Sequence, residues 1–157
     1  GFGQLVLHSS FVLTQSGAAV LFSGPSGIGK STQAALWKRF SGADVINGDR
    51  TLIRTGDITA HGVFYSGTSG ICKNASAPIR AIVLLDKADE NTLRRAGAKE
   101  AFAAILGQCS YYQWDVESAI RMTDIVAELV RRADVYRLGC RADEGAVRLL
   151  QNELFGG

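Results

Sequence analysis

Residues 24–31 carry the residue types and the spacing that hold phosphate groups at the start of a helix. Their sequence is Gly-Pro-Ser-Gly-Ile-Gly-Lys-Ser, which fits G-x-x-x-x-G-K-[ST] at every fixed position. The glycines let backbone N–H groups approach a polyphosphate, and a helix N-terminus adds partial positive charge. Lys30 can reach the β- and γ-phosphates, and the Ser31 hydroxyl can bind Mg²⁺. The segment therefore predicts a loop that binds ATP or a related nucleoside triphosphate.

The segments on either side of this loop have the character that the motif requires. An apolar run over residues 18–22 precedes the loop and predicts a strand, and residues 31–37 follow it with a helical pattern. A strand, a glycine-rich loop and a helix in this order are the context in which the pattern binds nucleotides. The residues expected to contact the nucleotide are Gly24, Pro25, Ser26, Gly27, Ile28, Gly29, Lys30, Ser31 and Thr32.

Phosphoryl transfer also needs a carboxylate that faces the loop and its metal, and the chain offers two candidates. Asp86 follows the apolar run 82–85, and an aspartate at the end of a strand is a usual source of this carboxylate. Asp49 lies in the segment 47–49, Asn-Gly-Asp, whose residue types favour a turn. The general pattern favours Asp86, although a charged surface turn explains it as well. The residues alone leave both carboxylates open.

The composition is that of one globular domain over residues 1–157 and excludes some classes of partner. The chain has 157 residues, 46% of them hydrophobic, which is enough for a sizeable core. Its net charge of +2, without a block of Lys and Arg, argues against a nucleic-acid partner. No apolar run approaches the roughly 20 residues that span a bilayer, and no signal-peptide pattern is recognised. Three isolated cysteines fit reduced thiols, so we expect a cytoplasmic protein.

The pattern along the chain predicts an α/β protein with a mixed sheet. Ser9-Ser10 divides the first apolar segment into two expected strands, and Asn47-Gly48 is a strong hairpin signal. Because several early connections look like hairpins, the order of elements does not follow the alternation of a doubly wound sheet. The expected strands are 4–8, 11–14, 18–23, 44–46, 50–54, 58–65, 79–85 and 135–138. The expected helices are 31–40, 92–106 with a break near Gly97, 115–133 and 143–155.

Two segments together resemble the HPr kinase/phosphorylase family. They are residues 21–31, which include the glycine-rich loop, and residues 45–50, which include the Asn-Gly-Asp turn. The chain is most similar to the short HPr-kinase-like proteins, whose superfamily includes phosphoenolpyruvate carboxykinase. The likeness covers nearly the whole chain. Further matching segments are 7–10, 67–70, Asn74, 78–82, 135–138 and 145–147.

This resemblance implies a kinase catalytic domain with a mixed, largely antiparallel sheet. Asp49 matches an acidic residue that acts in such kinases as general base on a substrate hydroxyl or lies beside the metal. His8 matches a histidine that contacts the transferred phosphoryl group or the metal. Kinases of this family often have two adjacent aspartates where this chain has Gly48 and Asp49, which leaves both roles to one carboxylate. The resemblance thus favours Asp49 over Asp86.

We therefore expect ATP-dependent transfer of the γ-phosphoryl group to a serine-type hydroxyl of a protein, a peptide or a small molecule. The expected catalytic residues are Asp49, Lys30 and His8, and the expected Mg²⁺ ligands are Ser31 and Asp49. The alternatives are a nucleoside triphosphate hydrolase and a nucleotide-binding regulatory module without turnover. HPr kinases are hexamers, so the resemblance also points to a homo-oligomer.

The acceptor side is expected on the loop 67–74, whose glycines permit close approach of a substrate. Lys73 or Arg80 could stabilise the charge that spreads over the phosphoryl oxygens, although a solvated surface charge explains either one. An aromatic group at Tyr111, Tyr112 and Trp114 is more typical of a core, and could instead shape an adenine or partner pocket.

Overall fold

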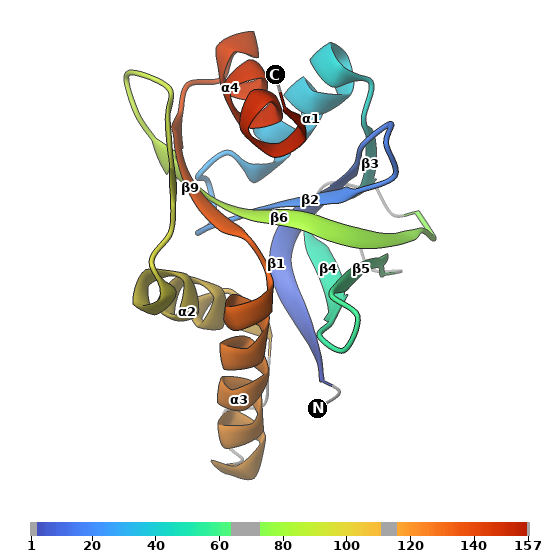
Figure 1. The fold of residues 1–157 in the computed structure, drawn as a ribbon, viewed down its shortest axis with the longest axis vertical. Helices are drawn as coiled ribbons and strands as arrows, with labels where there is room; N and C mark the ends of the chain where they lie inside the picture. Colours follow the sequence, from blue (N-terminus) through green and yellow to red (C-terminus); the bar gives the residue numbers. More distant parts are fainter. Residues whose placement is uncertain (1–2, 64–72, 111–115, 157) are drawn as a thin grey trace.

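A nine-stranded mixed sheet with helices on both faces forms the body of the molecule (Figure 1). The computed structural model describes residues 3–63, 73–110 and 116–156. The strands are β1 (Gln4–Leu13), β2 (Ala19–Ser23), β3 (Asp44–Asn47), β4 (Arg50–Arg54), β5 (Thr59–Gly62), β6 (Ser76–Lys87), β7 (Thr92–Arg95), β8 (Cys109–Ser110) and β9 (Val135–Cys140). The helices are α1 (Lys30–Ser41), α2 (Ala98–Gly107), α3 (Val116–Arg132) and α4 (Glu144–Phe155).

The pairing of the strands confirms the predicted fold class, α/β with a mixed and largely antiparallel sheet. Only β2 with β6 and β6 with β9 pair in parallel among the described residues. The other pairs, which include all those made by β1, are antiparallel. The pairing of β2 with β6 closes a ring of five strands in the order β2, β1, β4, β5 and β6.

Strand β1 is continuous, so the predicted break at Ser9-Ser10 is wrong. Both serines are fully buried, and their hydroxyls are satisfied by hydrogen bonds. The Ser9 hydroxyl donates to Thr51 Oγ1 at 2.7 Å, and the Ser10 hydroxyl donates to the Gly48 carbonyl at 2.9 Å. Polar side chains with such partners are tolerated inside a sheet. The polarity of the two serines is visible in the sequence, but their hydrogen-bond partners, Thr51 and Gly48, are not.

The hairpin predicted at Asn47-Gly48 is also wrong. Strands β3 and β4 do not pair with each other but follow one another along the same partner, β1. Phe11 lies opposite Asn47 and His8 lies opposite Arg50, so the pairs that flank residues 48 and 49 share one register, which shifts by one residue between Phe11 and Val12. The segment 47–50 is therefore a bend within one long antiparallel pairing. We call it the Asn47 bend.

The helix predicted over residues 92–106 is divided into a strand and a helix. Strand β7 pairs with β9 in antiparallel fashion, and α2 begins only at Ala98. The expected break at Gly97 is the actual start of the helix, where the Glu100 carboxylate accepts from the Gly97 amide at 3.3 Å. A long-range ladder thus overrides the local helical pattern of the first four residues. The short strand β8 was not predicted.

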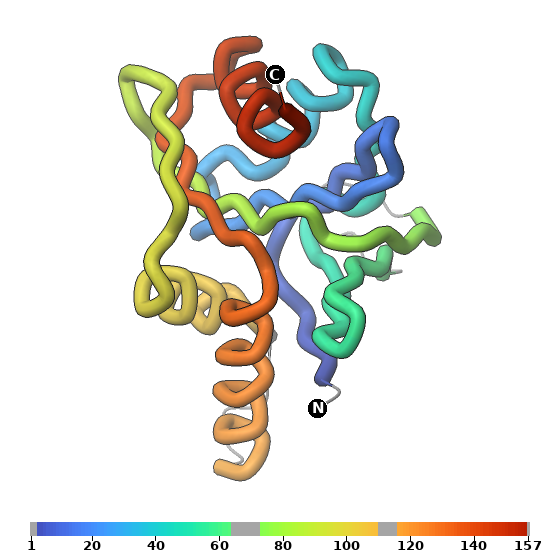
Figure 2. The backbone as a smooth tube through the Cα atoms, in the orientation of Figure 1, coloured from blue at the N-terminus to red at the C-terminus, as the bar shows by residue number. Residues whose placement is uncertain are grey.

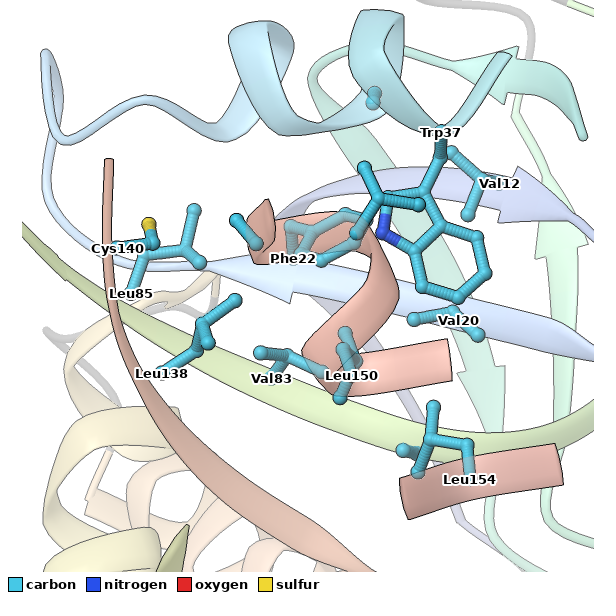
Figure 3. Close-up of a cluster of buried hydrophobic side chains, with 14 of the residues drawn as sticks. Val12, Val20, Phe22, Trp37, Val83, Leu85, Leu138, Cys140, Leu150 and Leu154 are labelled. Atoms are coloured by element: carbon cyan, nitrogen blue, oxygen red, sulfur yellow. The ribbon is translucent and has the colours of Figure 1, made fainter. Parts of the chain in front are cut away.

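Helices α1 and α4 cover one face of the sheet around a core centred on Trp37 (Figure 3). Trp37 on α1 is 1% exposed, and its ring lies 6.1 Å from that of Phe22 on β2. Leu150 and Leu154 of α4 belong to the same core, on the same face of the sheet as Trp37. Burial of these side chains fixes the first helix after the glycine-rich loop against the strand before it.

Helices α2 and α3 cover the other face, and α3 projects away from the body (Figure 2). Ile105 of α2 and Leu129 of α3 are fully buried against Leu84 of β6. Among the described residues, no helix has both the length and the apolar character needed to cross a bilayer. The two faces of β6 therefore contact different helices, which determines where the side chains at its end point.

An ion-pair cluster joins β7, α2, β9 and the end of β6. Glu100 accepts from Arg94 Nη1 and Nη2 at 2.7 Å each and from Arg137 Nε at 3.0 Å. Arg137 also lies 3.4 Å from the Asp86 carboxylate. Hydrogen bonds from Arg94 and then Arg137 lower the pKa of Glu100 to about 2. The charged form of Glu100 is thus favoured by the folded state.

We expect Glu100→Gln to flatten the acid dependence of stability. Because the folded-state pKa lies below the ordinary value of 4.5, this stabilisation is complete above about pH 4.5 and is lost as the pH falls toward about 2. The drop in melting temperature across that window should be smaller in Glu100→Gln than in the parent. Circular dichroism melts at several pH values measure it. Glu90→Gln, on the exposed turn after β6, is the control, and an equal drop in all three proteins would contradict the assignment.

Candidate functional site

The glycine-rich loop connects β2 to α1, as its flanking pattern predicts. Strand β2 ends at Ser23 and α1 begins at Lys30. Gly27 and Gly29 have φ angles of 82° and 115°, a region that residues with a side chain rarely adopt. Gly29 is the N-cap of α1, and no side chain caps the helix there. The backbone therefore presents the start of a helix to whatever the loop binds.

The Lys30 ammonium group folds back over the loop. Its Nζ donates to the Gly24 carbonyl at 2.7 Å and to the Pro25 carbonyl at 3.1 Å. Burial lowers the pKa of Lys30, and the nearby Asp49 carboxylate opposes that shift. An anion bound in the loop would favour the charged ammonium in the same way as Asp49 does.

The Asn47 bend brings a carboxylate to the loop from a different part of the chain. Gly48 and Asp49 line one cavity of about 290 Å³ together with residues of the loop and of the first turn of α1. The remaining lining residues are Ser26, Gly27, Gly29, Lys30, Ser31 and Thr32. The structure thus brings Asp49, Lys30 and Ser31 around one space, although Asp49 comes 18 positions after Ser31 along the chain.

His8 lies on β1, opposite Arg50 of β4; it is not among the residues that line this cavity, but the charges of Lys30 and Asp49 act on its imidazole. Its main-chain carbonyl accepts from the Ser23 hydroxyl at 2.8 Å, which ties it to the residue before the loop. Burial lowers the pKa of His8, and the positive charges of Arg50 and Lys30 lower it further, while Asp49 acts in the opposite direction. A neutral imidazole is the favoured form at neutral pH, so it can accept a hydrogen bond.

A second cavity of about 340 Å³ adjoins the first and shares Gly27, Gly29 and Thr32 with it. Its other walls come from the ends of β6 and β9, and they include Lys87 and Arg141. These two residues were missed by sequence reasoning because the parallel pairing of β6 with β9 is a long-range feature. The only signal for them was the position of each at the end of an apolar strand.

Asp86 does not face the glycine-rich loop. Successive side chains of a strand point to opposite faces, and Leu85 packs on the α1 face whereas Leu84 packs on the α2 face. Asp86 shares the Leu84 side of β6 and contacts Arg137, while Lys87 shares the Leu85 side and lines the second cavity. Of the two carboxylates that the residue pattern left open, Asp49 lines the first cavity and Asp86 lies on the other side of β6 from the loop.

The two cations proposed for the acceptor side, Lys73 and Arg80, make their contacts away from the glycine-rich loop. Lys73 Nζ donates to the Asp44 carboxylate at 2.6 Å. Arg80 contacts Asp134 at 2.9 Å and the Leu154 carbonyl at 3.0 Å, near the start of β6 and opposite the end that adjoins the loop. The other expected acceptor and aromatic residues lie outside the described part of the chain. They are residues 67–72 of the expected acceptor loop, Tyr111, Tyr112 and Trp114.

The oxygen donors around the first cavity fit a magnesium ion bound together with phosphate. Mg²⁺ prefers oxygen ligands and is usually held by one or two protein groups with substrate phosphates. Ser31 supplies a hydroxyl and Asp49 a carboxylate on the walls of the same space. Within the described ranges, no cluster of three or more His, Cys, Asp or Glu side chains could hold a metal by protein groups alone.

Comparisons with known proteins find a likeness in fold but do not assign the chain to a family. No protein-family model and no curated protein matches this sequence. One solved structure that matches is the HPr(Ser) kinase/phosphatase from Coxiella burnetii, with 14% sequence identity and a TM-score of 0.47. The match covers 94% of this chain and 91% of the other. A likeness at this level shows neither an activity nor a substrate for this chain.

We expect Lys30→Ala to weaken the binding of ATP. The variant removes the one ammonium group that lines the first cavity among the described residues, and a charge-assisted hydrogen bond contributes about 1.5–3 kcal/mol, or about 10- to 100-fold in affinity. Isothermal calorimetry with ATP and MgCl₂ measures the change. Lys38→Ala, in the last turn of α1, removes the same charge and should bind as the parent does. Equal affinities in Lys30→Ala and Lys38→Ala would show that the loop is not the binding site.

Proposed function

We propose that this protein is a kinase that transfers the γ-phosphoryl group of ATP to a serine-type hydroxyl. The observation that carries the proposal is the cavity of about 290 Å³ in which the glycine-rich loop and the Asp49 carboxylate meet. A cradle of amides with an ammonium group favours a polyphosphate, and a carboxylate across from it can accept a proton. The resemblance of the two segments that meet here to the HPr kinase/phosphorylase family supports the same activity.

The donor nucleotide spans the two adjoining cavities. Its β- and γ-phosphates lie against the loop amides, and Lys30 exchanges the Gly24 and Pro25 carbonyls for phosphate oxygens. The second cavity, at about 340 Å³, has the volume of a small-molecule pocket and takes the nucleoside. Lys87 and Arg141 on its walls favour the negative charge of the adjoining phosphates.

In the transfer step, the acceptor hydroxyl oxygen forms a bond to the γ-phosphorus while the bond from that phosphorus to the β–γ bridging oxygen breaks. The hydroxyl proton passes to the Asp49 carboxylate, and the electron pair of the broken bond leaves with ADP. Lys30 stabilises charge on the phosphate oxygens, and neutral His8 accepts or relays a hydrogen bond at the transferred group. Positioning and charge stabilisation supply most of the rate in such reactions.

Ser31 and Asp49 are the residues that would hold Mg²⁺. The ion, when bound, neutralises charge on the β- and γ-phosphates. The work left to the protein is to orient the triphosphate along the loop, to place the acceptor hydroxyl next to Asp49 and to take its proton. The two roles of Asp49 require that its carboxylate reach both the metal and the acceptor.

We expect Asp49→Asn to lower the rate of transfer far more than Asp86→Asn. An amide cannot take the hydroxyl proton, and removal of a general base costs about 10²–10⁴-fold in rate. Asp86 is exposed and lies on the opposite face of β6, so Asp86→Asn should leave the rate near that of the parent. The measurement follows γ-labelled ATP with MgCl₂ and two acceptors, free L-serine and a pool of serine-containing peptides.

The same assay separates this proposal from its alternatives. Label on a serine hydroxyl supports the kinase. Release of inorganic phosphate to water in the presence of every acceptor supports a hydrolase, and binding of ATP without turnover supports a regulatory module. A larger loss in Asp86→Asn than in Asp49→Asn would mean that the carboxylate has been assigned to the wrong strand.

A further inference from the structure

The Asn47 bend is held by a side chain to which neither the phosphate-loop pattern nor the family resemblance assigns a role. Asn47 is fully buried. Its Oδ1 accepts from the Asp49 amide at 2.8 Å and from the Arg50 amide at 2.9 Å. Its Nδ2 donates to the Val63 carbonyl at 3.1 Å, just beyond β5. One side-chain amide thus connects the backbone on both sides of the Asp49 carboxylate to a neighbouring segment.

Strand β1 holds the same bend from its other side. The Ser10 hydroxyl donates to the Gly48 carbonyl at 2.9 Å, and the Ser9 amide donates to the Asp49 carbonyl at 3.1 Å. Five of the seven polar side chains that are buried among the described residues belong to this region. They are Ser9, Ser10, Ser23, Asn47 and Thr51. Buried polar groups persist where each finds a partner, and their partners here are the bend and the strands beside it.

We propose that Asn47 is a positioning residue that orients the Asp49 carboxylate toward the metal and phosphates in the first cavity. This inference rests on the proposed function. Phe11 pairs with Asn47 and His8 pairs with Arg50 in one register, which shifts by one residue only beyond Phe11, so pairing with β1 would let residues 48 and 49 continue as a strand. The Asp49 and Arg50 amides instead donate to the Asn47 side chain. In this way Asn47 sets the direction in which the side chain of Asp49 points from the backbone.

The physical reason for a large effect is the short range of metal coordination and proton transfer. A group that orients a metal ligand typically changes metal affinity or activity by about 10- to 100-fold when it is removed. Asn47→Ala removes both acceptor contacts to the bend and the donor to Val63, while leaving every atom of Asp49, Lys30 and Ser31 in the chain. Its effect is therefore expected on magnesium-dependent binding and not on the loop's own contacts with phosphate.

Calorimetry with ATP, once with MgCl₂ and once with EDTA, tests the proposal without any acceptor. In the parent, MgCl₂ should increase the affinity for ATP. In Asn47→Ala this magnesium-dependent gain should fall by about tenfold, as in Asp49→Asn, while the affinity in EDTA stays the same. The magnesium-dependent gain should be no smaller in the double variant Asn47→Ala/Asp49→Asn than in Asp49→Asn alone, because the two changes remove the same interaction. Losses that multiply in the double variant would overturn the positioning role.

Amide hydrogen exchange provides a second readout that does not depend on nucleotide. Asn47→Ala should speed exchange at Asp49 and Arg50, whose amides lose their acceptor. Thr55→Val is the control, because Thr55 is equally buried and its hydroxyl bonds only with Gly3 at the far end of β4. It should destabilise the fold comparably and leave both the exchange at Asp49 and the magnesium-dependent gain unchanged. An equal loss of the gain in Thr55→Val would reduce Asn47 to a merely structural role and overturn the proposal.

If Asn47→Ala does not fold, Ser10→Ala replaces it, because that variant removes a single hydrogen bond to the bend at Gly48. A reduced magnesium-dependent gain that is non-additive with Asp49→Asn supports the proposal, and an unchanged gain overturns it. Failure of the proposed function is distinguishable. The parent would then show no magnesium-dependent affinity for ATP, and both proposals would fall. A gain in the parent that survives in the variants overturns only the inference about the Asn47 bend.

Discussion

The antiparallel register of β1 determines the whole arrangement of the site. On one edge Ser9 pairs with Ser23, the last residue of β2 before the glycine-rich loop. On the other edge Phe11 pairs with Asn47 and His8 pairs with Arg50, on the two sides of the Asn47 bend. A slip of one residue would turn every side chain of β1 to the opposite face and would separate the loop from the bend. The meeting of two segments distant in sequence is thus a consequence of strand pairing.

Burial of the polar side chains around the site costs free energy of folding, which burial of the apolar cores on both faces of the sheet offsets. Hydroxyl and amide groups in a sheet interior are stabilising only when each finds a hydrogen-bond partner. Ser9 and Thr51 bond to each other, and Ser23 bonds to the His8 carbonyl. Around Trp37 and around Ile105, apolar side chains provide the burial that keeps the strands together. Such a polar layer limits the alternative registers that the strands can adopt, which suits a site built from their ends.

Local sequence signals predicted the loop, α1 and the fold class, but not the long-range pairings. Residues 24–31 and the helix after them depend on glycine conformations and short-range hydrogen bonds, so a pattern within eight residues suffices to predict them. Asn47-Gly48 has the local signature of a hairpin, yet both flanking strands find a better partner in β1. Likewise the residues of β7 continue the helical pattern of the segment after them, yet they form a strand because they pair with the edge of β9.

The choice between the two carboxylates shows the same limit most clearly. Asp49 and Asp86 each follow an apolar strand, and nothing in the residues states which face of β6 packs against α1. Only the packing of Leu85 with α1 and of Leu84 with α2 turns Asp86 away from the loop. Lys87 and Arg141 were missed for the same reason, and Asn47 was interpreted as a hairpin residue, since the contacts of all three are with neighbours that the local pattern does not show.

A crystal structure with magnesium and a non-hydrolysable ATP analogue tests the central claim most directly. The account predicts that the triphosphate lies along residues 24–31, with Lys30 Nζ and the Asp49 carboxylate on opposite sides of the terminal phosphate and Ser31 on the metal. A triphosphate bound elsewhere, or a metal held by Asp86 while Asp49 points away from the phosphates, would contradict it.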